Sequence, residues 1–174
     1  MQAFQGEHIY LRALEPEDLD FLYQVENDTA FWEVSSTVTP YSRFVLEQYL
    51  ANAHLDIFEV KQLRLMIVEK SMDAPIGMID LFDFNPQHKR AGVGIMISEN
   101  KQNKGFASEA LELLINYSFR QLELHQLYAN ITPDNSNSLH LFKKFGFKQV
   151  GIKKEWLSIN GTFKDEALFQ LIRS

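Results

Sequence analysis

The feature that most constrains the fold is an apolar period in the middle of the chain. Seven apolar side chains follow one another at helical spacing: Ala107, Ala110, Leu111, Leu114, Ile115, Phe119 and Leu122. Recurrence at intervals of three and four residues is typical of a helix that buries one face. Short apolar runs at 92–98 and 127–132 flank this segment and predict strands. The order is therefore strand, helix, strand, which places the chain in the α/β class.

The remaining strands are predicted from short or alternating apolar runs at 8–14, 64–69 and 76–84. The last two are joined by a short turn and, together with 92–98, predict an antiparallel meander. The end of the chain is predicted as two strands joined at Asn160-Gly161. That dipeptide suits a tight hairpin, because both residues tolerate positive φ.

Three further helices are predicted. Helical patterns begin at Pro16 and at Ser42, both of which are residues that favour the start of a helix. A fourth helix runs through Lys144 and ends at Gly146. Segment 27–40 is aromatic and polar without a clear period, and is predicted to be a long loop.

Composition excludes several classes of protein. The 174 residues, 45% hydrophobic and 23% charged, predict one folded, soluble domain over 1–174. With no Cys, the chain has no disulfide, thiolate metal site or cysteine nucleophile. It shows neither a secretory leader nor an apolar run of about 18 residues, so we expect a cytoplasmic protein that does not bind membranes. The net charge of −6 disfavours nucleic acid and mildly favours cationic substrates.

No metal site is predicted. The histidines lack the paired spacing of metal ligands and do not stand beside a serine as a nucleophile's base would: His8, His54, His88, His125 and His140. We therefore expect structural roles for them.

The junction between strand 92–98 and the central helix carries the chemistry. The first amide N–H groups of a helix have no internal acceptor, and the helix dipole favours an anion there. Gly105 lets the backbone approach a ligand, and Lys101 and Lys104 add positive potential. A pyrophosphate would fit this loop. Many such junctions bind nothing, so the residues alone leave an anion site and a plain turn as equal alternatives.

The loop resembles the pyrophosphate loop of GNAT-superfamily N-acetyltransferases, Arg/Gln-x-x-Gly-x-Gly/Ala, at Gln102, Gly105 and Ala107. The family's later Asn and its helix ending in Gly-Phe are matched by Asn135 and Gly146-Phe147. The resemblance covers nearly the whole chain. It implies a single-domain fold with a mixed central sheet of about seven strands and about four helices, in which the fourth and fifth strands splay apart in a V.

The resemblance also implies acetyl-CoA as co-substrate, held between strands 92–98 and 127–132. The pantetheine arm would pair with the backbone of the first of these strands, in the manner of an added β-strand. The residues that the resemblance assigns to the cofactor are Ile97, Gln102, Asn103, Lys104, Gly105, Phe106, Ala107, Asn135, Ser138 and Phe142.

Within the superfamily the chain looks most like spermidine N-acetyltransferases, through Asp80, Asp83 and the segments 88–91 and 139–147. Ribosomal-protein N-terminal acetyltransferases look nearly as similar. The implied reaction is direct attack of a primary amine on the thioester. Its acceptor is a small amine or polyamine or, alternatively, a protein N-terminus, and the state of assembly, monomer or homo-oligomer, stays open.

The expected proton donor is missing. Spermidine acetyltransferases usually place a tyrosine where this chain has Phe142. A thiol with a pKa of about 8.5 can leave as the thiolate without full protonation. Ser138 either donates a hydrogen bond to the sulfur or only begins a helix. The substitution also motivates a third reading, an acyl-CoA-binding module without turnover.

A base is needed, because an amine with a pKa of about 10.4 must lose a proton before it attacks. The candidates are Asp80 and Asp83 on a strand beside the cleft, and Glu33 among aromatic residues of the 27–40 segment. Strand alternation puts the two aspartates on opposite faces unless a bulge intervenes, so at most one should face the substrate. The alternative for the two aspartates is a solvated strand end or a salt bridge with Lys89 or Arg90, and the alternative for Glu33 is an exposed loop position near aromatic core residues.

Overall fold

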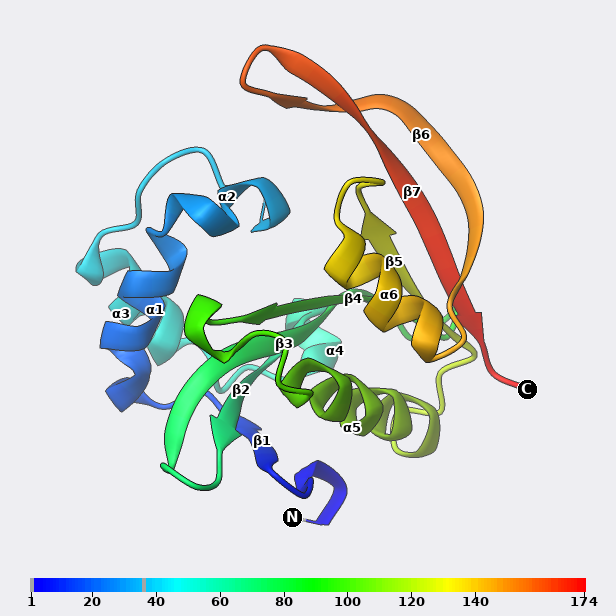
Figure 1. The fold of residues 1–174 in the computed structure, drawn as a ribbon. Helices are drawn as coiled ribbons and strands as arrows, with labels where there is room; N and C mark the ends of the chain where they lie inside the picture. Colours follow the sequence, from blue (N-terminus) through cyan, green and yellow to red (C-terminus); the bar gives the residue numbers. More distant parts are fainter. Residues whose placement is uncertain (1, 36) are drawn as a thin grey trace.

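A seven-stranded sheet forms the centre of the computed structural model, which describes residues 2–35 and 37–174 (Figure 1). Its strand order is β1-β2-β3-β4-β5-β7-β6. Neighbouring strands are antiparallel except β4 and β5, which are parallel. The strands are β1 (Ile9–Ala13), β2 (Leu63–Glu69), β3 (Ala74–Asn85), β4 (Arg90–Ile97), β5 (Gln126–Ile131), β6 (Lys148–Ile159) and β7 (Thr162–Ile172). The predicted mixed sheet and its meander are confirmed.

The fourth and fifth strands separate after a short contact. The parallel register of β4 and β5 joins Arg90–Gly92 to Gln126–Tyr128. Beyond these three pairs, β4 continues to Ile97 and β5 to Ile131 with no further pairing between the described strands. The predicted V-shaped splay is therefore confirmed, and it leaves backbone groups of both strands facing an opening.

The described residues form six α-helices, two more than the sequence predicted. They are α1 (Leu19–Glu26), α2 (Thr29–Ser35), α3 (Arg43–Ala51), α4 (Ile57–Val60), α5 (Phe106–Arg120) and α6 (Ser136–Lys144). Ser42 caps α3 as expected, because its hydroxyl accepts a hydrogen bond from the Val45 amide at 3.1 Å. The additional helices are α2 and the single turn α4. No helix in the described ranges has the length and apolar content needed to cross a membrane.

The prediction of a long loop over 27–40 was wrong for its first half, which forms α2. Tertiary contacts define this segment. The Asn27 side chain accepts a hydrogen bond from the Tyr41 amide at 2.7 Å and donates one to the Tyr41 carbonyl at 3.0 Å. The Trp32 indole N–H donates to the Glu26 carbonyl at 2.9 Å. These bonds connect residues up to fourteen positions apart, so a local periodicity does not reveal them.

Helices cover both faces of the sheet. On β2 the side chains of Leu65 and Ile67 pack into the core that contains α5, because alternate residues of a strand point to one face. Met66 and Val68 point the other way, into a second core with residues of α1 and α3. The V between β4 and β5 consequently lies between two flanks, α1 to α3 on one side and the long β6–β7 hairpin on the other (Figure 1). The hairpin turns at Asn160-Gly161, both with positive φ, as predicted.

Candidate active site

The loop before α5 is open to an anion. Gly105 is the N-cap of α5 and has a φ of 84°, in the left-handed region that favours glycine. The first helical hydrogen bond runs from the Glu109 amide to the Gly105 carbonyl at 3.2 Å, so the amides of residues 106–108 precede the helical ladder. The Gln102 side-chain nitrogen Nε2 donates to the Ile97 carbonyl at 3.0 Å, which ties the loop to the end of β4. This geometry suits a pyrophosphate.

The positive charge near this loop differs from the prediction. Lys101 was expected to attract an anion, but its ammonium forms an ion pair with Glu69 at 2.7 Å. Asn103 and Lys104 are exposed. Lys144, at the end of α6, places its ammonium 3.3 Å from the Ser108 hydroxyl on the first turn of α5. Lys104 and Lys144 are therefore the lysines placed to attract a phosphate here.

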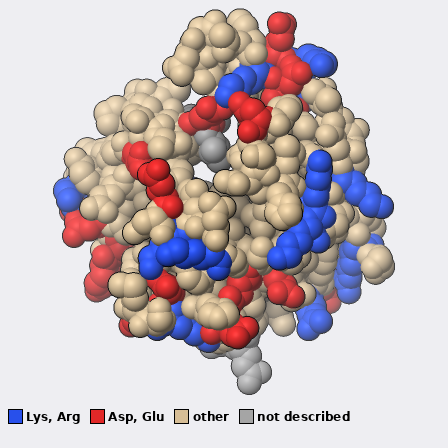
Figure 2. Space-filling model, in the orientation of Figure 1, with Lys and Arg blue, Asp and Glu red and all other residues tan. Residues whose placement is uncertain are grey.

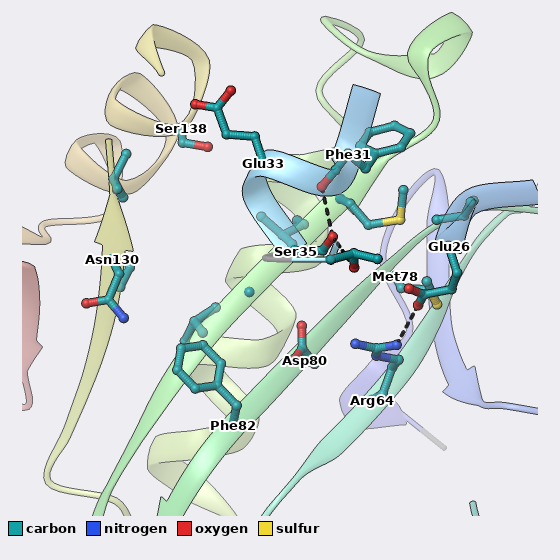
Figure 3. A pocket seen from close by; sticks show the side chains of 18 of the residues that line it. Glu26, Phe31, Glu33, Ser35, Arg64, Met78, Asp80, Phe82, Asn130 and Ser138 are labelled. Atoms are coloured by element: carbon teal, nitrogen blue, oxygen red, sulfur yellow. Dashed lines mark hydrogen bonds and ion pairs between the residues drawn. The ribbon is translucent and has the colours of Figure 1, made fainter. Parts of the chain in front are cut away.

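A cavity of about 730 Å³ lies between the two flanks of the V. Figure 2 shows the molecule hollowed there, with acidic and basic side chains around the opening. Residues 93–96 of β4 and 129–131 of β5 line the cavity together with side chains from α1, α2, α6 and β7 (Figure 3). Among the residues that the structure describes, no three His, Cys, Asp or Glu side chains are grouped as a metal site.

Helix α6 and its N-cap contribute two polar residues and one aromatic residue to the cavity. Asn135 caps the helix by accepting a hydrogen bond from the Ser138 amide at 3.2 Å. Both residues line the cavity, as does Phe142 one turn further along the same helix face. Phe142 is buried and packs edge-on against Phe147, with ring centroids 5.0 Å apart. The structure thus brings the three predicted residues of this helix to the cavity.

Asp80 lies in the floor of the cavity (Figure 3). It pairs across β3 and β4 with Gly94, where an added Cβ would lie 2.7 Å from Asp80 Oδ1. Because Gly94 has no side chain, the Asp80 carboxylate can occupy this space. Burial raises the pKa of Asp80, while the Arg64 guanidinium and the Gln62 side chain offset part of that rise. Gly94 is a sequence signal for this space that was not used in the prediction.

The other strand aspartate is outside the cavity. Asp83 is exposed, has a φ of 48° and sits at the bulge of β3 between Phe82 and Asn85. Its carboxylate accepts a hydrogen bond from the Tyr128 hydroxyl at 3.4 Å. The bulge turns this side chain away from the cavity lining, so the structure contradicts the use of Asp83 as a base.

Glu33 lines the cavity from α2, together with Phe31 and Tyr41 as the sequence predicted. It is already paired with a cation. The Lys164 ammonium lies 2.7 Å from Glu33 Oε1 and 2.7 Å from Asp134 Oδ2. The carboxylate is therefore a member of a three-residue charge cluster at the mouth of the cavity and is not a free base.

The sequence analysis did not identify several charged residues in and around the cavity. Glu26 and Arg64 form an ion pair at 3.0 Å near Asp80 (Figure 3). Glu166 pairs with Lys153 at 2.7 Å. The one available signal was Arg64 itself, a charged residue inside the apolar run of β2. Of the lining carboxylates Glu26, Glu33, Asp80 and Glu166, only Asp80 lacks an ion pair with a described residue.

A splayed parallel strand pair, a helix start open to an anion and a cavity beside them define an acyl-CoA-dependent transferase. The family profile described as acetyltransferase (GNAT) domain matches residues 8–148. The spermidine N(1)-acetyltransferase of Vibrio cholerae is 32% identical over 168 residues, covering 94% of this chain and 92% of the relative. The chain therefore belongs to the GNAT acetyltransferase family, and it is an N-acetyltransferase that uses acetyl-CoA as co-substrate.

Solved structures agree with this assignment. The Vibrio cholerae spermidine N-acetyltransferase in complex with CoA and spermine superposes with a TM-score of 0.86 and 28% identity, covering 95% of each chain. A dodecameric structure of spermidine N-acetyltransferase from the same organism gives a TM-score of 0.79 at 30% identity, covering 95% of this chain and 94% of that one. The whole fold, including the hairpin, is thus shared with these enzymes.

Proposed function

We propose that the protein acetylates the primary amino group of a small amine or polyamine. The observation that carries the proposal is Asp80, the lining carboxylate without an ion-pair partner among the described residues, in a cavity that opens on the splay of β4 and β5. An unpaired carboxylate in a half-buried site attracts an ammonium group and can accept its proton. The similarity to spermidine acetyltransferases supports an amine acceptor.

Acetyl-CoA would be held mainly by backbone groups. The pyrophosphate would lie on the amides of residues 105–108, with Asn103 and Lys104 beside it and Gln102 holding the loop to β4. The pantetheine would pair with unpaired backbone of β4 near Ile97. Asn135, Ser138 and Phe142 would then border the thioester from α6.

Asp80 would act as the base. The amine loses a proton to the carboxylate, directly or through water, and its nitrogen lone pair forms the new C–N bond at the thioester carbonyl. A carboxyl whose pKa is raised by burial is a stronger base than an exposed one. The C–S bond of the tetrahedral intermediate then breaks as the nitrogen releases its surplus proton to solvent, and CoA leaves as the thiolate.

Ser138 would assist the departure of sulfur by donating a hydrogen bond to it. The adjacent Phe142 has no proton to give, and its buried ring would instead exclude water from the thioester. Because a thiolate is a stable leaving group near neutral pH, a hydrogen bond can replace full protonation.

The proposal is tested by measuring CoA release with purified protein and three acceptors: spermidine, a simple alkylamine and a short peptide with a free N-terminus. Amine acetylation predicts release with at least one amine and a product whose mass has increased by one acetyl group. Release with the peptide alone would favour the second candidate, an N-terminal acetyltransferase. Acetyl-CoA binding without release from any acceptor would favour a module without turnover.

We also propose that the protein assembles into a homo-oligomer. The support is the dodecameric relative and a set of exposed apolar residues on the β6–β7 hairpin: Val150, Ile152, Trp156 and Phe163. Light scattering after gel filtration measures the mass in solution. A mass of one 20.2 kDa chain at micromolar concentration would contradict this proposal.

A further inference from the structure

Lys164 joins the two flanks of the cavity at its mouth. It lies on β7, and its ammonium is 2.7 Å from Glu33 on α2 and 2.7 Å from Asp134 in the turn between β5 and α6. Its side chain is 29% exposed, so the cluster is in contact with solvent. Figure 2 shows basic and acidic side chains together at this opening.

The chemistry of this cluster resembles that of the substrate proposed above. Lys164 carries a primary ammonium on an aliphatic stem, which is the group at each end of a diamine or polyamine. Its ammonium lies beside one oxygen of each carboxylate, Glu33 Oε1 and Asp134 Oδ2, and so neutralises one of the two negative charges that an ammonium at the mouth would otherwise meet. The pKa of Lys164 is raised by its hydrogen bonds to Asp134 and Glu33, so the ammonium stays charged at neutral pH.

The floor of the cavity offers the opposite situation. There, Glu26 is paired with Arg64, while Asp80 has no ion pair with a described residue. An acceptor with one ammonium therefore meets an unpaired carboxylate in the floor. An acceptor with a second ammonium at the mouth competes with Lys164 for Glu33 and Asp134, so the attraction that it gains there is weakened.

We propose that Lys164 is a specificity-determining residue, a tethered cation that competes with the second ammonium of an extended acceptor for Glu33 and Asp134. The inference rests on the proposed amine acetylation. It predicts that the native protein gives diamines and polyamines a smaller advantage in KM over monoamines of the same length than Glu33 and Asp134 would give without Lys164, with kcat unchanged.

A purely structural role is the competing account. The same contacts connect α2 to the β6–β7 hairpin, and losing them would loosen the cavity mouth for every acceptor. Such loosening would change KM for monoamines and diamines alike. Charge selection, in contrast, changes the ratio between them, which is the readout that separates the two roles.

The test compares Lys164→Met with the native protein on butylamine, putrescine and spermidine, at saturating acetyl-CoA. We expect KM to fall about two- to fivefold for putrescine and spermidine, the scale of one partly exposed ion pair, and to stay unchanged for butylamine. Lys164→Arg keeps the charge and should behave as the native protein. Lys154→Met is the matched control, because Lys154 pairs with Asp165 on the same hairpin outside the cavity lining.

A second variant covers the case in which Lys164→Met does not fold. Glu33→Gln leaves Lys164 with Asp134 alone and removes one attractive carboxylate, so KM for putrescine should rise while KM for butylamine changes less. In the combined variant Glu33→Gln with Lys164→Met, the gain for putrescine should shrink. Equal changes for all three amines, or no change in any, would overturn the role of Lys164.

Failure of the proposed function is recognised separately. If the native protein binds acetyl-CoA in calorimetry but releases no CoA with butylamine, putrescine or spermidine, amine acetylation is wrong and the role of Lys164 falls with it. If the native protein acetylates the amines but the KM ratio does not respond to Lys164→Met, the proposed function stands and this inference alone is wrong.

Discussion

The cofactor side and the acceptor side of the site are built in different ways. The cofactor side consists of consecutive residues, 102–107, and backbone groups of β4. The acceptor side consists of side chains from α1, α2, β2, β3 and β7, and its longest link connects Glu33 to Lys164 across 131 positions. A ligand bound by backbone groups is thus encoded by a local motif, whereas a ligand bound by side chains depends on how distant segments pack.

The largest effect is expected from a substitution in the local sequence motif of the cofactor side. Gly105→Glu should abolish acetyl-CoA binding, because it places a carboxylate on the anion site at a residue whose φ of 84° is strained for any side chain. An added Cβ meets no atom within 4 Å, so the fold should survive. Titration calorimetry measures the loss.

Gly161→Glu is the matched control for this variant. Gly161 has a φ of 80° and equally open surroundings, but it lies in the β6–β7 turn. It should bind acetyl-CoA normally. Unchanged binding by Gly105→Glu would refute the placement of the pyrophosphate, and lost binding in both variants would point to a general effect of the substitution.

The next effect tests the acceptor side. Asp80→Asn should lower kcat/KM for an amine by about 10²–10⁴-fold, because an amide cannot take the proton that the ammonium must lose before its nitrogen attacks. Acetyl-CoA affinity should stay unchanged. Asp83→Asn on the same strand is the control, since Asp83 lies outside the cavity. Equal losses in both variants, or none in Asp80→Asn, would remove Asp80 as the base.

Ser138 should show a smaller effect at the boundary between the two sides. Ser138→Ala removes the proposed hydrogen bond to sulfur and should reduce kcat by about tenfold, with little change in acceptor KM. The Ser138 backbone bond to Asn135 is retained, so the helix cap stays intact. Ser136→Ala, at an exposed position of α6, should leave kcat at the native value. A native kcat in Ser138→Ala would assign Ser138 to helix capping only.

The smallest effect concerns stability and pH. Because burial raises the pKa of Asp80 in the folded state, its contribution to stability is full below the ordinary aspartate pKa of about 3.9 and is lost as pH rises through the raised value. Asp80→Asn cannot ionise, so it should melt a few degrees above the native protein at pH 8 and at nearly the same temperature at pH 4. Melting curves at both pH values test the sign.

Asp165→Asn should show the opposite trend. Hydrogen bonds from the Glu155 amide and from Lys154 lower the pKa of Asp165, so its contribution is present at neutral pH and lost on acidification. This variant should melt slightly below the native protein at pH 8, with the gap closing as pH falls. The same sign for both variants would mean that burial does not govern Asp80.

Most of the fold was predictable from the chain alone. Apolar periods located the seven strands and four of the helices, and local turn chemistry located the Ser42 cap and the Asn160-Gly161 turn. The error at α2 has a physical cause. Asp28 accepts a hydrogen bond from the Ala30 amide at the start of α2, a local signal that was not used. The Asn27 bonds to Tyr41 and the Trp32 bond to Glu26 hold the segment in place without changing its local pattern of apolar residues.

The candidate site divides in the same way. The residues of the cofactor loop and of α6 were predictable, because each group acts within a few positions of the chain. The sequence did not reveal which carboxylates form ion pairs or point away from the cavity. Three of the four lining carboxylates are neutralised by cations from other elements, and a bulge turns Asp83 outward. Lys101 was likewise expected to attract an anion, but it forms an ion pair with Glu69.

By itself, the sequence determined the order of the seven strands and of four helices, and the open helix start at Gly105 that we propose as the pyrophosphate site. These depend on backbone groups whose geometry follows from neighbouring residues. The tertiary structure alone decided which lining carboxylate has no ion pair with a described residue and which cation pairs with Glu33 and Asp134 at the cavity mouth. Coulomb interactions act through space at a few ångströms, so Asp80 and Lys164 take on meaning only when the sheet, helices and hairpin bring their partners together.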